Sequence, residues 1–148
     1  MANPKPFVQI AAFCENLLEE ADGAMTPVRI IDTYWVPPLP EGLPDGMRPI
    51  VLVKGIIALK SGDVTGPHAV SLEMENTQGV RTKLSPEEGW PVVFNGGEHG
   101  VNLKINFPLG VKNFGLCWFD VFFDGELVTR IPLRLREGAP PTEEKSKS

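Results

Sequence analysis

The sequence predicts an all-β fold: a mostly antiparallel β-sandwich of about eight to nine strands with at most one short helix. The 148 residues include 15 glycines and 15 prolines, against typical frequencies of about 7% and 5%. Apolar runs of strand length return along the chain, separated by glycine, proline, asparagine and aspartate. Several runs alternate between apolar and polar residues, which is typical of strands with one buried and one solvated face. These observations favour many strands joined by turns.

The N-terminal part begins with an apolar segment, residues 7–13, which we expect to form the first strand. Residues 14–23 are the only stretch with helical character, since two leucines stand among acidic residues and Gly23 offers a stop. At most one or two helical turns are expected there, and a loop is the alternative. Residues 27–36 form the second expected strand.

A long connection follows, because residues 37–49 contain too many prolines for a central strand or a helix. Residues 50–59 are the most apolar stretch and are hydrophobic on both faces, so we expect them to form a central strand. Gly55 within this strand indicates a bulge or a close approach of another backbone.

Two amphipathic strands are expected over residues 70–75 and 101–107, where apolar and polar side chains alternate. The shorter strands VRTKL and PVVF lie between them. Residues 95–100, NGGEHG, are expected to form a turn, and His68 is expected to lie in another.

The clearest local signal is a hairpin near the C-terminus. Asp124 and Gly125 separate two strand-like runs, and an Asp-Gly pair supplies the positive φ angles of a type I′ turn. Pro132 removes a ladder donor from the second arm, which we expect to be an edge strand or to pair on only one side near that proline. Together the strands predict a sandwich; a closed barrel is the alternative, which the uneven strand lengths disfavour.

The organisation expected is one domain over residues 1–137, followed by a disordered polar tail over residues 138–148, which has no apolar anchor. The formal net charge of −5 argues against a nucleic-acid binder, which needs basic residues to neutralise phosphates. It argues equally against a surface attracted to anionic membranes.

A cytoplasmic location is expected, because the N-terminus lacks the uninterrupted apolar run of a secretory signal. No window is long and apolar enough for a transmembrane helix. Cys14 and Cys117 are then expected to be buried free thiols, with a disulfide across the core as the alternative. Two cysteines and two histidines without paired spacing make no zinc site.

Two segments, AFCENLLEEADGAMTPVRIID and CWFDVFFDGELVTRIPLRL, resemble a family of uncharacterised bacterial proteins. The resemblance extends over residues 7–136 and implies an immunoglobulin-like β-sandwich that ends in an aromatic strand, Asp-Gly and a final strand. It implies no established activity and no site. The chain departs from true immunoglobulin domains, since no tryptophan closely follows Cys14 and no tyrosine stands two residues before Cys117.

No catalytic constellation is apparent, and we expect neither an enzyme nor a cofactor or metal. The sequence lacks a phosphate-binding glycine loop, a zinc-protease helix and a nucleophile elbow. Glu98 and His99 are adjacent in NGGEHG and could serve a reaction, but a polar turn is the simpler interpretation. Asp120, within an apolar strand, needs a partner, and Arg130 across the hairpin is the expected one.

The candidate binding residues are Tyr34, Trp35, Trp90 and His99, because aromatic side chains beside loops are favoured at recognition surfaces. The function expected is a non-catalytic interaction or accessory module that binds a protein partner, or another copy of itself, through loops or an edge strand. One alternative is a small-ligand or carbohydrate-binding module that uses the loop aromatics. Another is a structural component of a bacterial or phage assembly.

Overall fold

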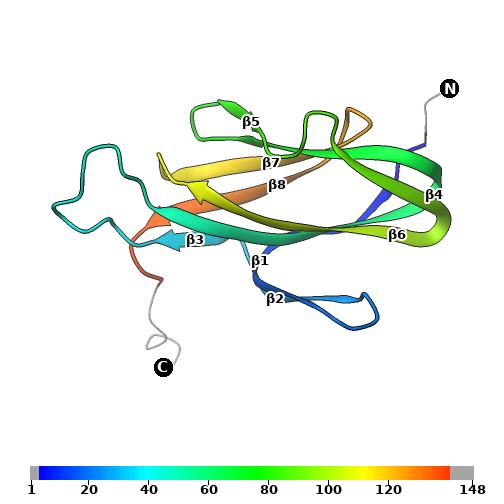
Figure 1. Ribbon diagram of the computed structural model, residues 1–148, viewed down its shortest axis with the longest axis horizontal. Coiled ribbons are helices and arrows are strands. Elements are labelled where there is room, and N and C mark those ends of the chain that lie inside the picture. The colour runs from blue at the N-terminus through cyan, green and yellow to red at the C-terminus, as the bar shows by residue number, and fades with distance from the viewer. Residues whose placement is uncertain (1–3, 141–148) are drawn as a thin grey trace, which may run out of the picture.

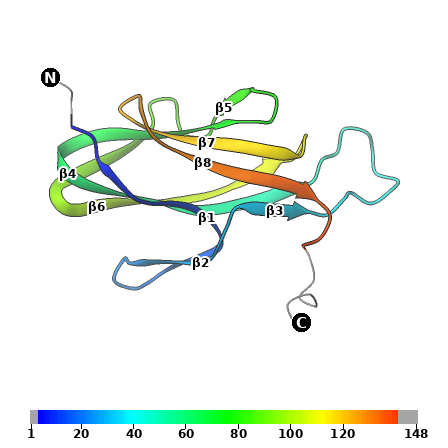
Figure 2. The ribbon, with the colours of Figure 1, turned by 180° about the vertical axis from the view of Figure 1, so that it is seen from behind.

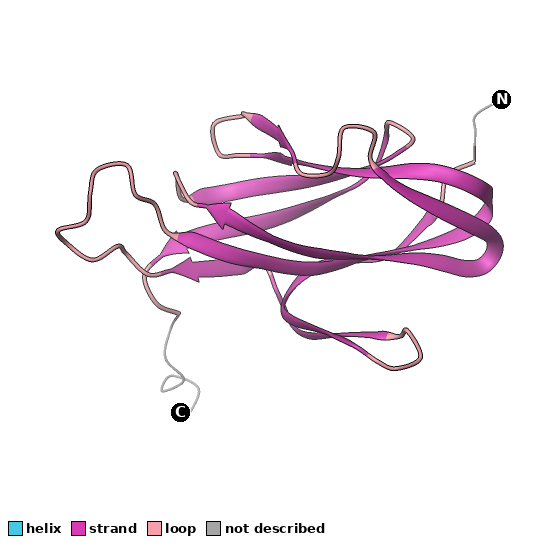
Figure 3. Cartoon of the chain, in the orientation of Figure 1, coloured by secondary structure: helices cyan, strands magenta, loops and turns pink. Residues whose placement is uncertain are grey.

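The computed structural model describes residues 4–140, and these form an all-β fold without helix (Figures 1 and 3). Its eight strands belong to one mixed sheet. The strands are β1 (Phe7–Glu19), β2 (Met25–Ile31), β3 (Thr33–Val36), β4 (Ile50–Glu75), β5 (Arg81–Lys83), β6 (Trp90–Gly110), β7 (Gly115–Phe123) and β8 (Glu126–Glu137). The predicted all-β class is therefore confirmed, and the short helix allowed over residues 14–23 does not form.

A long bent ribbon of β4 and β6 organises the molecule. The two strands pair antiparallel from Ile50 opposite Gly110 to Val70 opposite Trp90, with irregular register around residues 60–65. The first half of β4 also pairs with β1, whereas its second half pairs with β7 and β5. The single sheet therefore folds back on itself, and its halves lie as two layers in Figures 1 and 2. Two separate sheets are not present, so the immunoglobulin-like arrangement is not confirmed.

The hydrophobic core lies between these layers. Phe13 of β1 and Phe119 of β7 meet edge to face, with ring centroids 4.8 Å apart. Such aromatic pairs add to the stabilisation that comes from burying their area. The other large side chains that are fully buried are Phe94, Ile57, Leu59, Leu72, Leu133, Val36, Val53, Val64, Val70 and Val121.

The expected second strand, residues 27–36, is split at Asp32. β2 pairs with β1, while β3 pairs in parallel with β8, beginning at Thr33 opposite Arg134. The Asp32 carbonyl accepts the Arg134 N–H at 2.9 Å, so the chain changes partner strands at this residue. From Arg134 onward, β8 therefore pairs with β3, and at Arg134 it also pairs with β7 on its other side. Near Pro132 it pairs only with β7, as the proline predicts.

The segment expected to be helical instead completes β1 and forms a hairpin with β2, which lies outside the lower layer in Figure 1. Met25 and Pro27 of this hairpin line a hollow together with Ile56 and Ala58 of β4. Ile56 and Ala58 alternate with core residues and are each only 4% exposed. The hairpin therefore explains why this face of β4 is apolar at Ile56 and Ala58, whereas Ile50 and Leu52 on the same face are 71% and 49% exposed. The central position of residues 50–59 in the sheet is confirmed.

The segment NGGEHG is not a turn between strands. It lies within β6 opposite the bend of β4, with Gly97 paired to Gly62. Gly62, Gly96 and Gly97 all have positive φ, a conformation that glycine adopts without steric cost. The glycines thus bend a continuous ribbon. His68 likewise lies within β4, opposite Val92.

The predicted close approach at Gly55 is confirmed. A Cβ atom at this position would lie 2.5 Å from the carbonyl oxygen of Ala12 on β1. Cys14 and Cys117 are both free and buried, as expected, and burial raises the pKa of each thiol. The described chain ends at Pro140, so the expected tail lies largely outside the described residues.

Candidate functional site

Tyr34 is fixed by the backbone of two other strands. Its hydroxyl donates to the Cys14 carbonyl at 3.3 Å and accepts the Lys54 N–H at 3.1 Å. Cys14 and Lys54 form the last residue pair of the ladder between β1 and β4. The Tyr34 hydroxyl therefore bridges these two strands at the end of their ladder. Burial raises the pKa of Tyr34. This side chain therefore stabilises the sheet.

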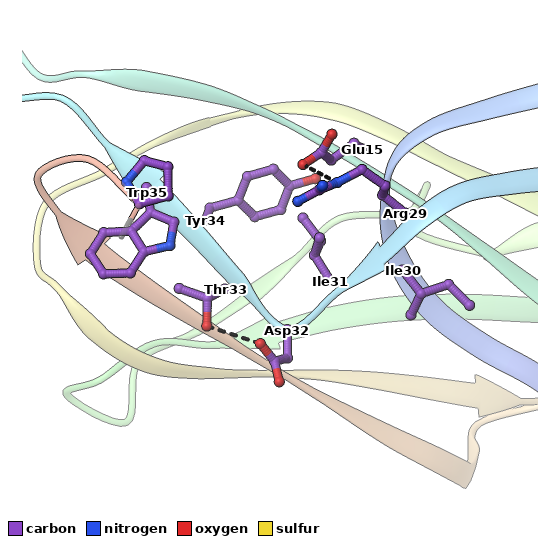
Figure 4. A pocket seen from close by; sticks show the side chains of 9 residues that line it. Glu15, Arg29, Ile30, Ile31, Asp32, Thr33, Tyr34 and Trp35 are labelled. Atoms are coloured by element: carbon purple, nitrogen blue, oxygen red, sulfur yellow. Dashed lines mark hydrogen bonds and ion pairs between the residues drawn. The ribbon is translucent and has the colours of Figure 1, made fainter. Parts of the chain in front are cut away.

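An open pocket of about 650 Å³ lies beside Tyr34 and Trp35 (Figure 4). Its wall includes an ion pair between Arg29 Nε and Glu15 Oε1 at 2.9 Å, and the Thr33 hydroxyl donates to Asp32 Oδ1 at 3.0 Å. The charged groups of Arg29 and Glu15 thus neutralise each other.

Trp35 belongs to a second, apolar surface at the end of the molecule that carries the 37–49 loop (Figure 1). A groove of about 520 Å³ is lined by Leu39, Met47 and Phe114 among others, and a groove of about 370 Å³ by Trp35 and Phe114. The shared Phe114 joins the two grooves. Leu39, Met47 and Phe114 are 38%, 51% and 39% exposed. We call Trp35, Leu39, Met47 and Phe114 the loop-end surface.

The rim of the loop-end surface is basic. The charged residues that line the two grooves are Arg48, Lys112, Arg134, Arg136 and Glu137. Within residues 4–140, none of these four cations forms an ion pair. The Arg136 guanidinium lies over the Trp35 ring, 5.8 Å from its centroid, which is a cation–π geometry. The acidic residues of the loop, Glu41 and Asp45, do not line either groove.

The other two candidate residues lie apart from Tyr34 and Trp35. Trp90 begins β6 opposite Val70 and packs, half-buried, against the core. His99 is exposed in the bent part of β6, where its carbonyl accepts the Ser61 hydroxyl at 2.7 Å. The four candidates therefore form no single site. Among the residues that the structure describes, no cluster of three histidine, cysteine or acidic side chains is placed to hold a metal ion.

Asp120 has the partner that the sequence predicts and a second one. Arg130 Nε donates to Asp120 Oδ1 at 2.7 Å, and Arg81 Nη2 donates to Asp120 Oδ2 at 2.9 Å. Burial alone raises the pKa of this carboxyl, but the two guanidinium groups outweigh burial and hold the pKa below its ordinary value. Arg81 also pairs with Glu73 and Glu75. Each of the three carboxylates in this cluster has at least one guanidinium partner, and Asp120 and Glu75 each have two.

Sequence reasoning did not single out Leu39, Met47 or Phe114. For Leu39 and Met47 a signal was present, since large apolar side chains in a proline-rich connection that cannot be a strand have no core position to fill. Phe114, in the β6–β7 connection, carried no such signal. What the sequence did not show is that the 37–49 loop and the β6–β7 connection meet, where the Val111 N–H donates to the Pro49 carbonyl at 2.9 Å.

No protein-family model matches the chain, and no curated protein is significantly similar to it. None of the described residues lies in a helix that is long and apolar enough to cross a membrane.

Proposed function

We propose that this protein is a non-catalytic interaction module that docks a protein partner on the loop-end surface. The observation that carries the proposal is the convergence of Trp35, Leu39, Met47 and Phe114 at one end of the molecule, around two adjoining grooves. Exposed apolar groups that gather inside a polar rim are typical of protein-binding surfaces. Immunoglobulin-like sandwiches present their binding loops at one end, and the loop-end surface has a comparable place at one end of this folded sheet.

The chemistry of the surface specifies the partner. Tryptophan and arginine dominate the energetics of protein interfaces, and Trp35 and Arg136 are stacked on each other here. Four cations without an ion-pair partner in the described part of the chain and one acid line the grooves, so the partner should present an apolar centre with an acidic rim. The two free, buried cysteines suit action in the reducing cytoplasm.

The small-ligand alternative through the loop aromatics has less support. Both hydrogen-bonding capacities of the Tyr34 hydroxyl are used by the backbone, and Trp90 packs against the core instead of joining Trp35. A carbohydrate platform would need several free aromatic faces in one place.

Site-specific photocrosslinking tests the proposal. A photoreactive amino acid replaces Met47 at the loop-end surface or, as a control, Val93, which is 61% exposed on β6. Irradiation in a lysate of the source organism should give one discrete adduct with another, acidic protein from position 47 and none from position 93. The adduct should weaken as salt rises, because the rim attraction is screened. Adducts between copies of this chain, or equal adducts from both positions, would refute the proposal.

A further inference from the structure

A second cavity lies where the two layers diverge between β5 and the end of β6. It encloses about 340 Å³. β5 and β6 each pair with no strand other than β4 in the described chain, so no strand closes this side of the molecule. We call this space the β5–β6 cavity.

The floor of the cavity is part of the hydrophobic core. Met74, Val111, Cys117 and Leu135 line it and are each at most 9% exposed. The walls add Leu84 and the β6 side chains Phe107 and Leu109. A ligand in this space would touch apolar side chains from five strands or their connections, and small-molecule sites are concave and mostly apolar in this way.

The polar groups stand at the rim and include one charge. Lys112 is the only charged residue that lines the cavity, and it has no carboxylate partner among residues 4–140. The side-chain oxygen of Asn76 is already occupied, because it accepts the Gln78 and Val80 N–H groups at 2.9 Å. The fitting ligand is therefore apolar along its length and anionic at one end.

The volume sets the length of the ligand. A methylene group needs about as much room as a water molecule, whose share of liquid volume is ~30 Å³, so the cavity has room for about ten such groups. We propose that the β5–β6 cavity binds a linear monocarboxylate of about ten carbons, with its chain on Met74, Phe107 and Leu135 and its carboxylate at Lys112. This inference does not rest on the loop-end surface as a protein-docking site, although Lys112 lines a groove of that surface as well.

Methionine-methyl NMR on the full chain gives a direct test, with decanoate as the probe. Met74 lines the β5–β6 cavity, Met47 lies on the loop-end surface, and Met25 lies on the β1–β2 hairpin. Decanoate should shift the Met74 methyl signal saturably, at a concentration below about 1 mM, and leave those of Met25 and Met47 unchanged. A silent Met74, or a shift of Met47 alone, would overturn the proposal.

Two variants separate the charge from the cavity. Lys112→Glu should weaken decanoate binding up to about fivefold and strengthen binding of decylamine, since an exposed ion pair has at most about this effect. Val80→Trp places a large side chain at the 55%-exposed rim and should abolish the Met74 shift with both probes. The matched control, Val93→Trp, should bind like the parent. Decanoate binding that neither variant changes would contradict the assigned site.

Met47 reports on the loop-end surface and Met74 on the β5–β6 cavity, so the experiments can refute either proposal without refuting the other. A chain that binds decanoate but no protein refutes only the docking function. A chain that docks its partner through Met47 but leaves Met74 unmoved refutes only the carboxylate site.

Discussion

Arg130 Nε donates to Asp120 Oδ1 at 2.7 Å, directly across the β7–β8 ladder from it. Asp120 is 4% exposed, and Arg81 from β5 caps its other oxygen at 2.9 Å. The contact ties the short β5 strand to the final hairpin through one carboxylate. β5 contributes only three residues to the sheet and pairs there with β4 alone, so this carboxylate adds a link from β5 to β7 and β8.

Replacing Asp120 should therefore destabilise the fold. We expect Asp120→Asn to lower the free energy of unfolding by about 3 kcal/mol, the low end for breaking a buried ion pair, because both arginines still reach solvent. Glu73→Gln, which removes a more exposed partner of Arg81, should cost at most about 1 kcal/mol. Urea denaturation measures both, and equal losses in the two variants would contradict the central place of Asp120.

Acid titration adds a second check on Asp120. Its pKa is lower in the folded chain than the ordinary value, so its stabilising effect is complete above the ordinary carboxyl pKa and is lost as pH falls through the folded value. Parent and Asp120→Asn should therefore differ most in stability near neutral pH and converge in strong acid. A difference that stays constant with pH would be inconsistent with a charged Asp120.

His68 should make stability depend on pH in the opposite direction. Its Nδ1 lies 2.6 Å from Asp124 Oδ2 and its Nε2 lies 2.9 Å from the Thr65 carbonyl. Both partners are acceptors, so the ring must carry a proton on each nitrogen to satisfy them. The hydrogen bond to Asp124 is the largest cause that raises the pKa of His68, and the hydrogen bond to the Thr65 carbonyl is the next. Its contribution is complete below the unfolded value near 6.5 and is lost as pH rises through the folded pKa.

Thermal melting at pH 6 and pH 9 checks this expectation. The parent should melt a few degrees higher at pH 6, and His68→Gln should remove most of that difference. The chain has one other histidine, His99, which is exposed, so His99→Gln is the control and should keep the parent's pH dependence. A pH dependence that survives in His68→Gln would refute the role of His68.

Gly55 should tolerate no side chain. A Cβ atom there would lie 2.5 Å from the Ala12 carbonyl oxygen, which is backbone and cannot swing away. We expect Gly55→Ala to cost about 2–3 kcal/mol, as overpacking typically does. Gly110, at the end of β6, has nothing within 4 Å of a Cβ, so Gly110→Ala should change the urea midpoint little. Similar midpoints for the two variants would show that β1 and β4 are farther apart than described.

Tyr34→Phe separates a structural tyrosine from a binding one. The change leaves the Lys54 N–H and the Cys14 carbonyl without their hydroxyl partner and should cost about 1–2 kcal/mol of stability. Partner binding through the loop-end surface should be unchanged. A loss of binding at unchanged stability would instead place the Tyr34 hydroxyl in the interface.

Local patterns predicted the strands well. Contacts between residues close in sequence determine the alternation in residues 70–75 and the Asp124-Gly125 turn. The partner of Asp120 could be predicted because a buried charge needs a counterion. The same reasoning failed for residues 14–23, where apolar and acidic residues suit either an amphipathic helix turn or a strand. There the pairing with β2 decided, and pairing is a tertiary effect.

Long-range features were beyond the sequence for a physical reason. The glycines of NGGEHG permit a sharp turn as readily as a bend in a continuous strand, and only the register with β4 distinguishes the two. Trp35 was a candidate because of its residue type, whereas Phe114 joined it only through the meeting of two distant loops. Local sequence patterns do not show which loops meet, so the sequence predicted only Trp35 of the four residues in the proposed loop-end surface.

The most direct test of the docking function is to measure how tightly the crosslinked partner binds the Trp35→Ala variant, compared with the parent chain. Phe114→Ser is a second variant, at a more exposed position. By titration calorimetry we expect each variant to bind the partner at least about thirtyfold more weakly, which is the loss typical of a hot-spot side chain. The control Val93→Ala should bind within twofold of the parent. Parent affinity in both Trp35→Ala and Phe114→Ser would contradict the assignment of the loop-end surface as the docking site.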